Sequence, residues 1–124
     1  MMTDTTRFET TVRHEPGTQV AVVEMSGEIN DLAEHELNDA YARAIVSDPA
    51  RILLNFGRVD YINSTGIALI VGLLARARKE HRAMTACGLS DHYREVFEIT
   101  RLADFMSIFP DEASAVSGLP ASAR

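Results

Sequence analysis

The residues best suited to chemistry form one short polar cluster near the middle of the chain, in the stretch YINSTGIALI. Asn63, Ser64, Thr65 and Gly66 separate two apolar runs there. Two interpretations fit these residue types. In the first, Asn63 or Ser64 caps the N-terminus of a helix and Gly66 permits close packing. In the second, the Ser64 hydroxyl is there to be modified.

A phosphate group is the modification that suits this position. It would add a charge of about −1.5 to −2, and the N-terminus of a helix stabilises negative charge within the protein. The same charge would disrupt any partner surface that presses on the loop. Ser64 is therefore the candidate phosphorylation site, with Thr65 as the second choice.

The remaining residues give no support to an enzymatic site. Ser64 does not lie in a G-x-S-x-G elbow, because Ile62 stands two positions before it. The histidines match no triad or metal-ligand spacing and are expected on the surface: His14, His35, His81 and His92. P-loop and dinucleotide motifs are also missing from the sequence. The sequence predicts a protein that is not an enzyme and that uses no metal or cofactor.

Composition indicates an ordinary globular protein with protein partners. The chain has 124 residues, of which 46% are hydrophobic and 24% are charged. Its net charge of −6 argues against nucleic acid or an anionic membrane as the main partner. Cys87 is the only cysteine and is expected to be a small buried residue in a reducing compartment. The sequence has neither an apolar signal core nor a run of about 20 apolar residues, so we expect a cytoplasmic protein.

A basic run near the end of a predicted helix is a second candidate partner site. It consists of Arg76, Arg78, Lys79 and Arg82. One interpretation is a solvated helix end, since positive charge is favourable at a helix C-terminus. The other is a docking patch for an acidic partner surface. The sequence leaves both interpretations open.

Hydrophobic periodicity predicts the elements that position these residues. Strands are expected over residues 8–13, 20–25, 51–56, 83–89 and up to Phe109, with the segment 57–61 as a loop. Helices are expected after Asn30 or Asp31, from about residue 65 to 81, after Ser90 and after Pro110. This alternation predicts an α/β fold with a mixed, mainly parallel sheet of about five strands and about four helices.

Two of the predicted helices have distinctive faces. The first carries a buried stripe formed by Ala33, Leu37, Ala40, Tyr41, Ala44 and Ile45. The second is apolar nearly all round in its first half, so that half is expected to be buried on most sides, with the basic half toward solvent. We expect a single domain over residues 1–118, followed by a flexible tail over residues 119–124.

Three segments resemble the STAS domain of bacterial anti-sigma factor antagonists. DYINSTGIALIVGLL resembles the family signature D-[YF]-[MI]-D-S-[ST]-G-[LI]. VVEMSGEIN resembles its strand followed by G-E-[IL]-D, and YREVFEITRLADFMSIFPDEASAV resembles its closing segment. The resemblance runs from about residue 8 to residue 116, and the expected element order is that of the family.

The resemblance implies a regulatory function without chemistry of its own. In the family, the serine after the acidic residue is phosphorylated by a partner that is both a serine kinase and an anti-sigma factor. That serine is Ser64 here. The unphosphorylated antagonist binds the kinase and frees the sigma factor, and a phosphatase restores binding after phosphorylation. The partner-binding residues implied are Asn30, Asp31, Asn63, Ser64, Thr65 and Gly66. The oligomeric state stays open, with a weak homodimer as one alternative.

The sequence departs from the family pattern at three positions. Asn63 and Asn30 replace aspartates that face the kinase, and Arg101 replaces a glycine. Asparagine keeps the acceptor oxygen of a cap but loses the charge. Either the partner has a compensating surface, or the domain acts mainly as a STAS scaffold in a complex that does not end on a sigma factor. A small enzyme or ligand-binding domain is a third hypothesis.

Overall fold

The computed structural model describes residues 7–117, which alternate between strands and helices in the predicted order. The strands are β1 (Glu9–His14), β2 (Val20–Ile29), β3 (Arg51–Ile62), β4 (Ala83–Cys87) and β5 (Ser107–Phe109). The α-helices are α1 (Glu34–Ala44), α2 (Ser64–Lys79), α3 (Asp91–Ile99) and α4 (Glu112–Ser117). Short 3₁₀ turns are η1 (Asp31–Ala33), η2 (Ile45–Ser47) and η3 (Leu102–Asp104). The predicted tail, 119–124, lies outside the described residues.

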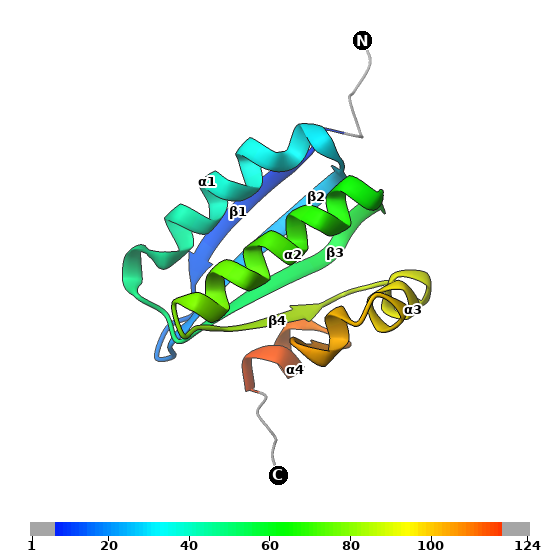
Figure 1. The fold of residues 1–124 in the computed structure, drawn as a ribbon. Helices are drawn as coiled ribbons and strands as arrows, with labels where there is room; N and C mark the ends of the chain where they lie inside the picture. Colours follow the sequence, from blue (N-terminus) through cyan, green and yellow to red (C-terminus); the bar gives the residue numbers. More distant parts are fainter. Residues whose placement is uncertain (1–6, 118–124) are drawn as a thin grey trace.

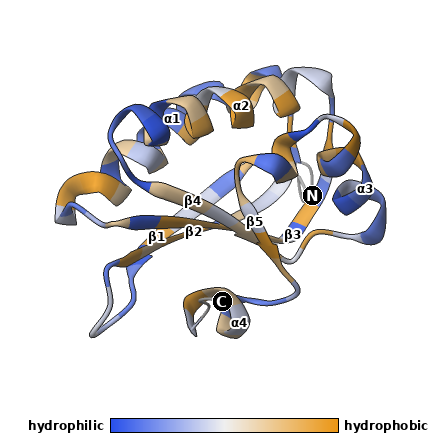
Figure 2. Ribbon diagram, turned by 60° about the horizontal axis from the view of Figure 1, so that its bottom comes forward, coloured by the Kyte–Doolittle hydropathy of each residue, from blue (hydrophilic) through white to orange (hydrophobic). Residues whose placement is uncertain are grey.

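The five strands form one sheet in the order β1-β2-β3-β4-β5, so the predicted α/β class is confirmed. β1 and β2 form an antiparallel hairpin, and every later pairing is parallel. Helices α1, α2 and α3 lie on one face of the sheet, and α4 lies on the other (Figure 2). In this arrangement α1 and α2 run side by side over the sheet and begin at the same end of it (Figure 1).

Two clusters of buried side chains stabilise these layers. The main core lies between the sheet and the first three helices, and it includes the predicted α1 residues Leu37, Ala40, Tyr41 and Ala44. The smaller cluster lies on the α4 side and consists of Val20, Val22, Leu53, Cys87 and Ala115. Cys87 is buried, as predicted, and its burial raises the pKa of the thiol to about 11. The thiol is therefore protonated at neutral pH, as expected for a packing residue.

The strands β2 and β3 are both longer than the sequence predicted. Residues 57–61, expected to be a loop, continue β3, because the parallel pairing extends to Glu28 opposite Tyr61 and Ile29 opposite Ile62. The pairing passes two irregularities, and Gly27 lies between them with φ of +93°. Glycine adopts this conformation easily, so it bends the strand where we had expected it to end.

The first half of α2 is more exposed than predicted. Ala68, Gly72 and Ala75 are exposed, and Val71 retains 45% of its accessible surface. The helix lies on the outer layer and packs on the sheet through Ile70, Leu73, Leu74 and Ala77. Its outer side carries three small residues together with Val71, so part of this almost uniformly apolar segment stays in water. The expectation that this half is buried on most sides was wrong.

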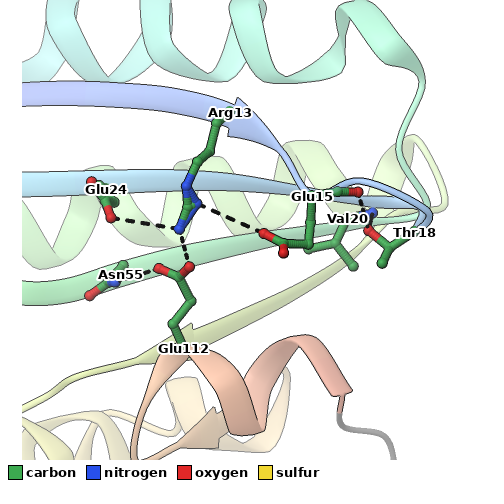
Figure 3. A network of polar contacts seen from close by, with 7 residues as sticks. All are labelled: Arg13, Glu15, Thr18, Val20, Glu24, Asn55 and Glu112. Carbon is green, nitrogen blue, oxygen red and sulfur yellow. Dashed lines mark hydrogen bonds and ion pairs between the residues drawn. The ribbon is translucent and has the colours of Figure 1, made fainter.

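A polar network joins α4 to the face of the sheet that it covers, which is the face away from α1, α2 and α3 (Figure 3). The Arg13 guanidinium on β1 pairs with Glu112 of α4 and approaches Glu24 at 3.7 Å. The Asn55 Nδ2 amide on β3 donates to the other carboxylate oxygen of Glu112 at 2.9 Å. Glu112 thus joins the six-residue helix to two strands, which complements the small apolar cluster beneath it.

Arg101 follows α3 in the left-handed conformation, with φ of 70° and ψ of 10°. This conformation is unfavourable for residues with a side chain, by roughly 1–2 kcal/mol. Replacing Arg101 with glycine should therefore raise the free energy of unfolding by about 0.5–1 kcal/mol, as measured by urea denaturation. The exposed ion pair between Arg101 Nε and Asp104 (2.6 Å) would be lost and offsets part of the gain.

The matched control for this prediction is Arg101→Ala. It removes the same ion pair but keeps a side chain in the left-handed region, so it should not stabilise the protein. If alanine and glycine gave equal stabilities, the backbone conformation would not be the cause.

Candidate functional site

The predicted polar cluster forms the beginning of α2, and Asn63 is its capping residue. Asn63 has an extended backbone, and its Oδ1 accepts a hydrogen bond from the Gly66 N–H at 2.8 Å. Its carbonyl oxygen accepts the first helical bond, from the Ile67 N–H at 2.9 Å. The capping role that the sequence left open between Asn63 and Ser64 therefore belongs to Asn63.

Gly66 packs the start of α2 directly against the end of β2. A Cβ atom placed on Gly66 would lie 2.1 Å from the carbonyl oxygen of Ile29 and 2.9 Å from the Ile62 side chain. The same Ile29 carbonyl accepts a hydrogen bond from the Asn63 N–H at 3.2 Å. Only a residue without a side chain permits this contact, so Gly66 is buried and acts through packing.

Ser64 is the first residue of α2 and is exposed. Within residues 7–117, its hydroxyl makes no hydrogen bond, and neither do the backbone N–H groups of Ser64 and Thr65. These N–H groups belong to the first turn of the helix, where no intrahelical acceptor is in reach. Thr65 is exposed as well. Two exposed residues at one helix end thus carry hydroxyl groups and backbone amides that make no hydrogen bond within residues 7–117.

The other predicted site residues lie in the turn between β2 and α1. Asn30 Oδ1 accepts a hydrogen bond from the Leu32 N–H at 2.9 Å, so Asn30 caps the turn η1. Asp31 is exposed. Because η1 contacts α2, the tertiary structure brings the sequence-distant residues 30–31 and 63–66 to the same end of the sheet. The hydrogen bond from the Asn63 N–H to the Ile29 carbonyl oxygen joins the two segments.

Two exposed apolar residues at this end of the molecule were not predicted from the sequence. Leu32 retains 84% of its accessible surface, and Tyr61 at the end of β3 retains 51%. Leu32 lies outside the buried stripe that begins at Ala33, and this position in the sequence could have predicted its exposure. Tyr61 was expected in a loop, so the direction of its side chain could not be predicted.

The basic run is not a single free patch. The Arg82 side chain is only 13% exposed, and it pairs with Asp48 at 2.9 Å and with Glu80 at 3.1 Å. The Arg76 guanidinium lies over the Tyr41 ring at 4.3 Å from its centroid. Burial, together with the hydrogen bond from its hydroxyl to Glu80 (2.7 Å), raises the pKa of Tyr41 to about 12. Half of this run, Arg76 and Arg82, therefore makes contacts within the protein, and the other half, Arg78 and Lys79, is exposed.

The histidines lie where the sequence predicted them. All four are exposed, and His14 Nε2 approaches the Ala44 carbonyl oxygen at 3.3 Å. Among the residues that the structure describes, no three His, Cys, Asp or Glu side chains are arranged to hold a metal ion. None of the helices in residues 7–117 has the length and apolar character needed to cross a membrane.

Comparison with known sequences places these features in a family. The profile of the family described as "STAS domain" matches residues 9–115. A protein of Bordetella bronchiseptica named as a candidate anti-sigma factor antagonist, BtrV, is 33% identical over 86 residues, which cover 69% of this chain and 72% of that protein. The anti-sigma-B factor antagonist of Staphylococcus aureus is 30% identical over 69% of this chain and 80% of its own length.

Solved structures of low sequence identity have the same fold. An anti-sigma factor antagonist from Mycobacterium paratuberculosis superposes with a TM-score of 0.76 at 20% identity, over 94% of this chain and all of that chain. The phosphorylated form of the Bacillus protein SpoIIAA superposes with a TM-score of 0.63 at 20% identity, over 86% of this chain and 96% of that chain. With the family profile covering nearly all described residues, the chain belongs to the STAS domain family.

Proposed function

We propose that this protein is an anti-sigma factor antagonist that binds an anti-sigma factor with serine kinase activity and is switched by phosphorylation of Ser64. The observation that carries the proposal is the position of Ser64, which is exposed and free of hydrogen bonds to residues 7–117 at the first position of α2. The relatives in Bordetella and Staphylococcus support it through their names.

The geometry around Ser64 can accommodate a phosphate without refolding. Asn63 already fills the N-cap, so phosphorylation of Ser64 would break no capping bond. The free N–H groups of Ser64 and Thr65 can donate to phosphate oxygens, and the positive end of the helix dipole favours the added charge. Phosphorylation would therefore change the charge of the surface while the fold stays intact.

The contact surface proposed for the partner combines the turn η1 with the first turn of α2. Ser64, Thr65 and Asp31 are exposed there and can touch a partner directly. Asn30 and Asn63 have a different role, since their side chains cap η1 and α2. The two segments are held together by the packing of Gly66 against Ile29 and by the hydrogen bond from the Asn63 N–H to the Ile29 carbonyl oxygen. In the proposed pathway a phosphatase removes the phosphate and restores binding.

The direct test is to incubate the full chain with a candidate serine kinase of the same genome and ATP, followed by peptide mass spectrometry. We expect one phosphate on the peptide that contains Ser64 and none on the Ser64→Ala variant. A phosphate moved to Thr65 in that variant would identify the second acceptor. Stable kinase binding without any phosphate would contradict the switch and would favour the scaffold function.

A further inference from the structure

We propose that Leu32 is an apolar anchor that the anti-sigma factor partner buries when it covers Ser64. The proposal rests on the proposed function and deepens it, since it names a contact residue and the chemistry of the partner surface. Leu32 is the most exposed large apolar residue among those the structure describes, at 84%. It lies in η1, which contacts the helix that begins with Ser64.

The turn holds Leu32 outward in a fixed conformation. Its N–H donates to Asn30 Oδ1 at 2.9 Å, and the N–H of the next residue, Ala33, donates to the Asn30 carbonyl oxygen at 3.0 Å. Ala33 is fully buried and begins the apolar stripe of α1. Ala33 is thus fixed inward and Asn30 fixes the backbone of Leu32, whose side chain is left exposed. Because the backbone of Leu32 is already ordered, its burial by a partner costs only the rotamer freedom of the side chain.

The charges near Leu32 indicate what kind of surface covers it. The exposed residues Asp31 and Glu34 flank it in sequence, and the exposed Asp60 lies on β3, one residue before the partner of Glu28 in the sheet. The basic residue Arg58 lies earlier on β3, where it is paired with Ser26 of β2. A second copy of this chain placed face to face here would bring these carboxylates together, which is unfavourable. The surface therefore fits a partner with an apolar pocket and a basic rim.

This arrangement also explains how the site functions with two asparagines. The side-chain oxygens of Asn30 and Asn63 both accept capping hydrogen bonds within the chain. Their contribution is to position Leu32 and Ser64, while exposed acids such as Asp31 supply the charge. A phosphate on Ser64 would then place a dianion beside an apolar contact. The partner could not bury that charge without a large desolvation free energy.

The test compares Leu32→Ala with Val46→Ala in full-length protein. Val46 is a matched control, because it is 81% exposed in η2, at the opposite end of α1. The probe is the purified kinase that phosphorylates Ser64, with binding measured by isothermal titration calorimetry. We expect Leu32→Ala to weaken binding about 10- to 100-fold and Val46→Ala by less than about twofold. Thermal melts should show equal stability of both variants, since neither residue is buried.

Equal binding of wild type and Leu32→Ala would overturn the anchor while leaving the proposed function in place. Failure of the wild-type chain to bind the kinase would overturn both. Sedimentation velocity measures, as a second test, whether the chain forms dimers. A concentration-dependent dimer that is lost in Leu32→Ala alone would assign this surface to a second copy of the chain and would contradict the proposal.

Discussion

Replacing Gly66 with alanine is expected to lower the free energy of unfolding by about 3 kcal/mol. The added Cβ would lie 2.1 Å from the Ile29 carbonyl oxygen and 2.8 Å from its carbonyl carbon. These are backbone atoms of a central strand, so the clash cannot be relieved by a side-chain rotation. Either α2 or the end of β2 must shift by more than an ordinary packing adjustment.

Gly72→Ala is the control for this prediction, because both glycines lie in α2. Nothing lies within 4 Å of a Cβ atom placed on Gly72. Alanine there should raise the free energy of unfolding by about 0.5–1 kcal/mol, since it is the better helix former. Urea denaturation of the two variants should therefore shift in opposite directions. An increase in the free energy of unfolding in both variants would show that helix propensity, and not the contact with Ile29, decides the outcome.

The Gly66→Ala variant should also lose partner binding under conditions where it remains folded. The hydrogen bond between the Asn63 N–H and Ile29 depends on the same close approach. Moving α2 away would separate Ser64 from η1, and a partner could no longer contact both. Calorimetric titration with the purified kinase well below the melting temperature would measure this loss.

Replacing Ser64 with aspartate is expected to weaken binding to the kinase by at least about tenfold while preserving the fold. Ser64 is exposed in the first helical turn, where a negative side chain interacts favourably with the helix dipole. The carboxylate would nevertheless introduce charge at the centre of the proposed contact. Ser64→Ala removes only a hydroxyl that makes no hydrogen bond to residues 7–117, so it should bind as the wild type does.

The control for added charge is Ser47→Asp, an exposed position at the opposite end of α1. It makes the same change in net charge, from −6 to −7, far from the proposed contact. Binding should be weakened by Ser64→Asp and almost unchanged by Ser47→Asp. Equal effects would show that the partner responds to the overall charge and that the Ser64 loop is not the interface.

The sequence by itself determined the class of fold and the position of the polar cluster that begins α2. Strands and helices alternate with different hydrophobic periods, and these periods reflect local geometry that each segment carries by itself. The α1 stripe and the burial of Cys87 followed for the same reason. The polar cluster at residues 63–66 was recognisable because capping residues and glycine are uncommon between apolar runs.

Only the tertiary structure decided how these parts act together. The choice of Asn63 as cap, the contact of Gly66 with Ile29 and the outward direction of Leu32 all depend on where β2 ends relative to α2. The lengths of β2 and β3 and the exposed side of α2 depend on pairing and layering between segments distant in sequence. Such contacts leave no periodic signal, because their energy comes from the partner segment and not from the residue's own neighbours.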